Sequence, residues 1–190
     1  MKKFLVMFAC MFTACACSAG GLFLGAHGAY TLGGDVENES FGYGVQIGIM
    51  GDNLGLELSG TLVEDDNPPS PSDETQFELG TIALTLLLGG NITDDMRGYI
   101  GAGVNYNRFT FDSEAKLDYD DDDQVGFHAC AGVSIALADV LHLFVEYRHT
   151  IVQYDTKAFD SNDIVQGLDY IKLDEDYAFG MIRAGLNLVL

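Results

Sequence analysis

Apolar and polar residues alternate with a period of two along most of the chain, which is the repeat of a β-strand with two unlike faces. In residues 41–49 the odd positions are large and apolar, whereas the even positions are glycine or Gln46. No apolar stripe of helical period has a useful length. The segment 76–88 is apolar on both faces, so the pattern leaves its register open. The eight strands predicted in this way cover residues 21–32, 41–51, 54–63, 76–88, 97–111, 125–137, 141–154 and 177–190.

The connections between these segments alternate between short and long. Short links fall at 51–53, 89–96 and 138–140, and long acidic links fall at 33–40, 64–75, 112–124 and 155–176. Short turns at one end and long loops at the other describe an antiparallel up-and-down meander with both ends on the short-turn side. Segments of about ten residues suit tilted strands that cross a membrane, and only a closed barrel leaves no unpaired edge there.

A water-soluble barrel of the lipocalin kind is the alternative, with its apolar face turned inward around a ligand. Residue sizes argue against it, because the polar face is rich in small residues that suit a crowded interior and the apolar face is bulky and aliphatic. The sequence therefore predicts an all-β, eight-stranded transmembrane barrel. One aromatic girdle is expected at the long-loop ends, made of Tyr30, Phe41, Tyr43, Phe77, Tyr106, Phe109, Phe127, Tyr147, Tyr154, Tyr177 and Phe179.

The first residues have the order of a secretory signal peptide, with Lys2 and Lys3 before an apolar run and then small residues. A membrane-spanning helix that continues to Gly34 is the rival interpretation, but the glycines of residues 20–34 disfavour it. We expect a signal peptide at 1–19, cleaved before Gly20, and a barrel at 20–190. Because only Cys130 lies in the body of the chain, a disulfide framework is excluded. Lipidation at Cys15 or Cys17 stays open.

The end of the chain resembles the terminal strand signal that the bacterial barrel-assembly machinery reads, with Arg183, Gly185, Leu188 and Leu190 in the matching positions. The usual last residue is Phe. Together with Tyr-Ile-Gly-Ala-Gly-Val at 99–104 and Val-Glu-Tyr-Arg at 145–148, residues 20–190 resemble the superfamily of small OmpA-type outer-membrane β-barrel domains. The resemblance implies a Gram-negative outer membrane, with its lipid, its lipopolysaccharide and the assembly machinery as partners.

Composition narrows the remaining classes of function. The 190 residues carry 9 Lys and Arg against 29 Asp and Glu, a net charge of −20, yet 48% are hydrophobic. A disordered chain is excluded by the apolar fraction, and nucleic-acid binding is excluded by the lack of clustered cations. Of the 29 acidic residues, 22 lie in the four long links.

The densest acidic run lies at 118–123, and solvated surface charge is the ordinary account of it. The sharper hypothesis is weak binding of Ca²⁺ or Mg²⁺ between the acidic loops and lipopolysaccharide phosphates, since oxygen ligands suit these ions. The candidate ligands are Asp118, Asp120, Asp121, Asp122 and Asp123. The run lacks the spaced ligands of a dedicated calcium loop, so no resident metal or cofactor is predicted.

Strand parity places four charged residues on the inner face, namely Glu57, Glu146, Arg148 and Arg183, with His27, Gln46, Asn105 and His128 as polar neighbours. Buried charges are costly unless they are paired, so two of each sign predict a hydrogen-bonded network. An ion path or an acid and base pair is the functional alternative. We favour a structural plug, because side chains fill barrels of this size.

Catalysis is not predicted. His149 is expected to face lipid near the outer rim, where lipid A deacylase barrels have a His and a Ser separated by one residue, but here Ile151 stands in place of the Ser. Cys130 is expected to be an inert interior thiol. The sequence thus predicts a monomeric structural or surface-interaction protein with an unidentified extracellular partner. A narrow channel for small solutes or ions is the alternative.

Overall fold

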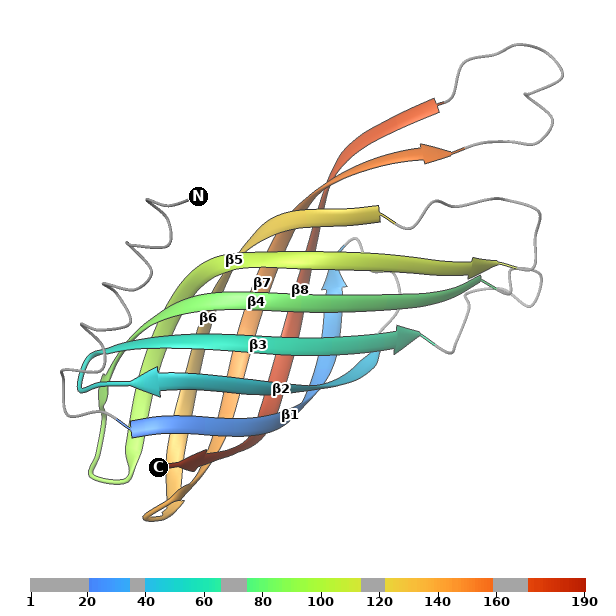
Figure 1. Ribbon diagram of the computed structural model, residues 1–190. Helices are drawn as coiled ribbons and strands as arrows, with labels where there is room; N and C mark the ends of the chain where they lie inside the picture. The colour runs from blue at the N-terminus through green and yellow to red at the C-terminus, as the bar shows by residue number, and fades with distance from the viewer. Residues whose placement is uncertain (1–20, 35–39, 66–74, 114–121, 159–170) are drawn as a thin grey trace, which may run out of the picture.

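The computed structural model describes residues 21–34, 40–65, 75–113, 122–158 and 171–190, and every regular element within them is a β-strand. Each strand pairs antiparallel with the next along the chain, and β8 pairs with β1 to close a barrel (Figure 1). This confirms the predicted fold class. The strands are β1 (Gly21–Gly34), β2 (Phe41–Met50), β3 (Leu54–Asp65), β4 (Thr75–Asn91), β5 (Met96–Ser113), β6 (Asp122–Ala138), β7 (Leu141–Ala158) and β8 (Ile171–Val189).

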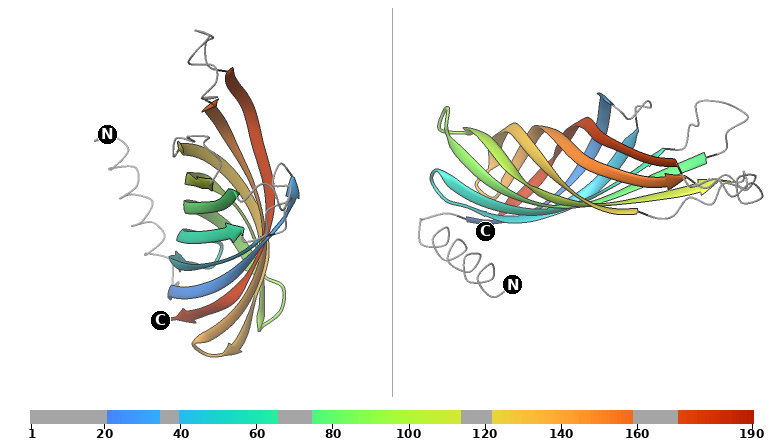
Figure 2. Two further views of the ribbon diagram at one scale, coloured as in Figure 1. Left: turned by 90° about the vertical axis from the view of Figure 1, so that its right-hand side faces the viewer. Right: turned by 90° about the horizontal axis from the view of Figure 1, so that it is seen from above.

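Most strands are longer than the alternation predicted, so the predicted bounds of the long acidic links were wrong. β5 continues to Ser113, β7 continues to Ala158, and β8 begins at Ile171. In this extension β7 and β8 stay in register, with Asp155 opposite Asp174. The antiparallel ladder is made by backbone groups, so pairing continues where the apolar alternation has stopped. Figure 2 shows how far the strands run beyond one end of the barrel.

Tight turns close the other end of the barrel. The link 51–53 joins β2 to β3, and the Gly51 amide donates to the Leu54 carbonyl at 2.8 Å. The last strand ends on this side, where the Leu190 amide donates to the Leu22 carbonyl at 2.8 Å (Figure 1). The predicted leader at 1–19 lies outside the described residues. Among the residues that are described, no helix has the length and apolar character needed to cross a membrane.

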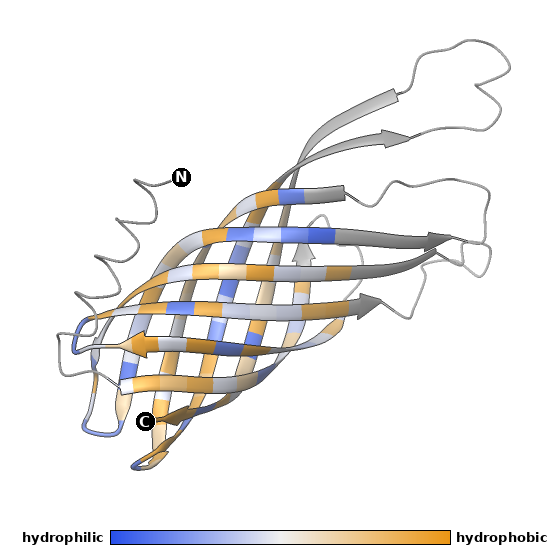
Figure 3. Cartoon of the chain, viewed as in Figure 1, coloured by the Kyte–Doolittle hydropathy of each residue, from blue (hydrophilic) through white to orange (hydrophobic). Residues whose placement is uncertain are grey.

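Side chains alternate between the lumen and the outer surface, and in β2 the buried Gln46 and Gly48 alternate with the exposed Val45 and Ile47. Figure 3 shows hydrophobic and hydrophilic residues following one another along the coloured parts of the strands. Val45 and Ile82 are among the large apolar residues that point outward, with 62% and 58% exposure. Pairing with β3 settles the register of β4, because Glu57 lies opposite Thr85 and both are buried. Because the side-chain period is two, the even-numbered leucines of β4 then face outward.

Five of the predicted girdle residues face outward, and their common level in a membrane stays a prediction. Phe41, Tyr43, Tyr106, Phe127 and Tyr147 are exposed on the outer surface. Phe179 was assigned wrongly, because it is only 1% exposed and lies in the lumen on the same face of β8 as Met181 and Arg183. Tyr30 is half-buried, with its ring centroid 4.8 Å from that of Phe41. The side chains of Phe77, Phe109, Tyr154 and Tyr177 lie outside the described part of the chain.

Candidate functional site

Four charged side chains from β3, β7 and β8 meet in the middle of the lumen. Glu57 Oε1 accepts hydrogen bonds from Nη2 of Arg148 and from Nη2 of Arg183, each at 3.0 Å. Glu146 Oε1 lies 3.1 Å from Nε of Arg148 and 3.1 Å from Nε of Arg183. Each carboxylate thus bridges both guanidiniums, and no side chain of the four is more than 5% exposed. We call these four residues the ionic cluster.

Neutral polar side chains surround the ionic cluster. Ser59 Oγ accepts from Arg148 Nη1 at 3.3 Å and from Arg183 Nη1 at 3.2 Å. Gln46 accepts from Arg183 Nη2 at 2.9 Å through its oxygen and donates to Asn187 Oδ1 at 2.8 Å through its nitrogen. Because these partners come from strands around the barrel, the two guanidiniums connect opposite walls of the lumen.

Two histidines lie beside the ionic cluster, each opposite a glycine of the neighbouring strand. His27 pairs in register with Gly44, and a Cβ built on Gly44 would lie 2.5 Å from the His27 ring nitrogen Nε2. His128 pairs with Gly103, whose added Cβ would lie 2.9 Å from His128 Nε2. The glycines make room for the rings to lie across the sheet. Nε2 of His128 is then 2.9 Å from the hydroxyl of Thr85.

The ionic cluster is electrically balanced, and this limits its chemistry. Two carboxylates and two guanidiniums sum to zero, and the pairing holds each charge in a fixed geometry. Among the described residues, Glu146 Oε2 is a buried oxygen with no hydrogen-bond partner. The arrangement suits cross-linking of strands. A general base needs a lone pair turned toward space for a substrate. Glu146 is only 1% exposed, so its carboxylate has no such space.

An apolar layer lies between the ionic cluster and the long-loop end. Its members are buried and come from β1, β3, β4, β7 and β8, namely Ala29, Val63, Leu79, Val152, Phe179 and Met181. This layer was not predicted from the sequence. The signal was present in β8, where Phe179, Met181 and Arg183 share one parity and therefore one face. Two layers of side chains thus fill the lumen, the ionic cluster and, nearer the long-loop end, the apolar layer.

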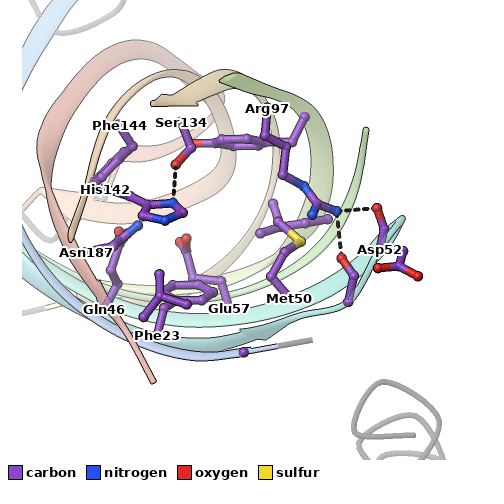
Figure 4. Close-up of a pocket in the computed structure, with 15 residues that line it drawn as sticks. Phe23, Gln46, Met50, Asp52, Glu57, Arg97, Ser134, His142, Phe144 and Asn187 are labelled. Atoms are coloured by element: carbon purple, nitrogen blue, oxygen red, sulfur yellow. Dashed lines mark hydrogen bonds between the residues drawn. The ribbon is translucent and has the colours of Figure 1, made fainter. Parts of the chain in front are cut away.

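A pocket of about 250 Å³ occupies the lumen on the short-turn side of the ionic cluster (Figure 4). Phe23, Met50 and Glu57 are among the residues that line it. Arg97 reaches across to the turn between β2 and β3, where its Nη2 donates to the carbonyls of Gly51 and Asp52, each at 2.7 Å. This pocket was not predicted from the sequence, because its residues come from strands far apart in the chain.

The other predicted site residues do not join this centre. His149 is exposed on the outer surface of β7, and Ile151 points the same way with 47% exposure. Cys130 is buried in the lumen as a free thiol. Asp118, Asp120 and Asp121 lie outside the described residues, and Asp122 and Asp123 are described only as backbone at the start of β6. In the described ranges, no three His, Cys, Asp or Glu residues gather as a metal site.

The proposed assembly-signal residues occupy both faces of β8, with Leu190 one position beyond its end. Arg183 belongs to the ionic cluster, and a Cβ on Gly185 would meet the Ala26 carbonyl and the His27 backbone. Leu188 and Leu190 are exposed on the outer side, at 50% and 79%. Their reading by an assembly machinery stays a prediction.

Comparison with known proteins supplies a family and a fold. The family model described as "Outer membrane protein beta-barrel domain" matches residues 4–171. Neisserial surface protein A is similar in structure, with a TM-score of 0.64 and 18% identity over 91% of this chain and 98% of that chain. OprG from Pseudomonas aeruginosa gives 0.59 and 15% over 91% and 96%. Ail, the attachment invasion locus protein of Yersinia pestis, gives 0.54 and 10% over 90% and 97%. No curated protein sequence matches.

Proposed function

The chain belongs to the family of outer membrane protein beta-barrel domains, and from this premise we propose that it is a structural and surface-interaction protein of the bacterial outer membrane, with a sealed lumen and no catalysis. A barrel of this class presents its long loops to the outside of the cell. The acidic residues of these links give the outer face a strongly negative charge. The expected partners are outer-membrane lipid, lipopolysaccharide, the barrel-assembly machinery during biogenesis and an extracellular partner not yet identified.

The observation that supports a sealed lumen is that two layers of side chains fill it, the ionic cluster and the apolar layer. A solute that entered from the short-turn side would reach the pocket and then the ionic cluster, whose side chains are at most 5% exposed. Beyond it stands the apolar layer, in which Leu79 and Phe179 are each 1% exposed. Thr31 and Thr150, which pair with Met181 and Phe179 of this layer, are buried as well, so the layer offers no open path. A hydrated ion would have to lose its water to pass, and such a loss is very costly.

A role at the cell surface has support from the fold neighbours as well. Ail is described as an attachment invasion locus protein, and its structure has also been determined with a heparin analogue, sucrose octasulfate. Loops of such barrels carry binding specificity on a rigid scaffold. The present chain has a net charge of −20, so a highly sulfated partner would be repelled and a cationic partner favoured.

His149 and the residue two positions after it form the one arrangement in the sequence that resembles an active site. A histidine can activate a nucleophile only within hydrogen-bonding reach. His149 has Ile151 two positions along the same outward face, and an isoleucine side chain supplies no nucleophile.

Conductance in planar lipid bilayers tests the sealed lumen. We expect the refolded protein to give no stable single-channel steps, because two packed layers block the path. Folding is verified on a gel, since an unheated barrel migrates differently from a boiled one. Stable steps from folded protein would contradict the proposal and favour the alternative, a narrow channel for small solutes or ions, for which the pocket at the short-turn end would be the entrance.

A further inference from the structure

The outer surface of the barrel carries a groove of about 540 Å³ across β2, β3, β4 and β5. Two glycines leave it open. A Cβ on Gly60 would meet no atom within 4 Å, and a Cβ on Gly80 would have Leu62 Cδ2 as its nearest neighbour at 3.5 Å. Both glycines therefore stand on the outer face where neighbouring positions carry large side chains. The groove exists because these two positions of the outer surface lack side chains.

Strand register shows how the walls of the groove are made. One row across the sheet places Gly60 between Val45 and Ile82, with Tyr106 next to Ile82. Val45 and Ile82 are 62% and 58% exposed, and Tyr106 is 43% exposed. These side chains stand up on either side of a glycine floor. The groove has the shape to hold an extended hydrocarbon chain, whose contacts with apolar side chains are favourable.

The next row brings a cation to the same groove. It runs from Tyr43 through Leu62 and Gly80 to Arg108, and Arg108 lines the groove as an exposed side chain. Gly60 lies in the middle of β3, whereas Arg108 lies in the half of β5 that leads to the long loop, so the cation is at the long-loop end of the groove. A guanidinium has five donors, so it can bind a phosphate while it keeps a protein partner.

A second groove on the outer surface lacks this charge. It measures about 820 Å³, extends over β4 to β7 near the short turns and is lined by Gly90, Gly98 and Ile100 among others. No charged residue belongs to its lining. The smaller groove thus combines an apolar floor with a cation at its outer end, whereas the larger one is apolar alone.

We propose that the groove over Gly60 and Gly80 is a binding site for one acyl chain of a phosphorylated outer-leaflet lipid, with a phosphate of its headgroup at Arg108. The outer leaflet of a Gram-negative bacterium contains lipopolysaccharide, whose lipid A part has both phosphates and several acyl chains. Tyr43 and Tyr106 line the same groove and are exposed, and tyrosine is enriched where a membrane meets water. This site deepens the outer-membrane role proposed above and rests on the long loops facing the outside of the cell, but it does not depend on the sealed lumen.

Native mass spectrometry of the folded protein in micelles tests the site, with diphosphorylated lipid A as the probe and the same lipid after removal of both phosphates as the comparison. We expect about tenfold tighter binding of the phosphorylated form, the order given by one hydrogen-bonded charge pair. Gly60→Val fills the groove, and Arg108→Gln removes the charge while keeping a polar side chain. Each variant is expected to lower lipid A affinity about tenfold, and Arg108→Gln is expected to abolish the preference for phosphate.

Gly90→Val is the matched control, because a Cβ there also meets no atom within 4 Å but lies in the uncharged groove. It should leave lipid A affinity unchanged. Equal effects of Gly60→Val and Gly90→Val, or equal affinity for the two lipids, would overturn the proposal. Heat-modifiable gel mobility verifies folding, and if Gly60→Val does not fold, Arg108→Gln decides alone. Bilayer conductance is independent of all these outcomes, so the surface role and the lipid site can fail separately.

Discussion

Arg148→Leu is expected to lower the free energy of unfolding by about 3–5 kcal/mol, the usual cost of removing one partner from a buried ion pair. The change leaves Glu57 with one cation in place of two and gives the lumen a net negative charge. It also removes the bonds from this guanidinium to Ser59 and Thr85. The quantity to measure is the urea dependence of refolding into lipid vesicles, with folded protein scored by gel mobility.

Three comparisons sharpen this result. Arg148→Lys keeps the charge and should recover part of the loss. His149→Leu changes the adjacent residue, which faces outward, and should shift the free energy by less than about 0.5 kcal/mol. Adding Glu146→Leu to Arg148→Leu restores neutrality, so the double variant should lose less than the sum of the two single changes. Unchanged stability of Arg148→Leu would refute a stabilising network. The bilayer conductance of this variant is expected to stay absent.

Phe179→Ala is expected to lower the free energy of unfolding by about 3–5 kcal/mol, because it opens a cavity in the apolar layer. Phe179 is 1% exposed and packs in one cluster with Val152 and Met181. The same urea titration measures the effect. The ionic cluster still closes the lumen below the cavity, so bilayer conductance should not appear.

Phe127→Ala serves as the control for this substitution, because Phe127 is 67% exposed on the outer face. Truncation there leaves space that lipid can fill, so the loss of stability should be clearly smaller. If the two alanine variants lost equal stability, Phe179 would have no special packing role in the lumen.

The alternation of side chains predicted the strands well, because a surface between lipid and lumen imposes a period of two on every strand. It left β4 undecided, since Leu86, Leu87 and Leu88 suit either face. Pairing of Thr85 with Glu57 on β3 settles the matter, and that partner lies far away in the chain. The strand ends were predicted too short for a related reason. Asp155 and Asp174 are polar, yet their backbones continue the ladder.

The lumen was predictable only as far as parity reaches. Parity alone identified Glu57, Glu146, Arg148 and Arg183 as inward-facing residues, but their mutual distances depend on the stagger of the strands around the barrel. The same stagger brings Arg97 to the carbonyls of the turn at 51–53, a contact between residues 45 and 46 positions apart. Side-chain pairs of this kind need the closed barrel before they can be recognised.

The ionic cluster has a consequence for the order of events when the barrel forms. Its hydrogen bonds join residues that are 91 and 126 positions apart in the chain, between β3 and the last two strands. Until β7 and β8 join the sheet, Glu57 has neither Arg148 nor Arg183 as a partner. An unpaired carboxylate inside a membrane is strongly disfavoured. An incomplete barrel therefore carries an electrostatic penalty that only the final strands remove. Closure of the sheet and neutralisation of the lumen become one step, which selects against insertion of truncated chains.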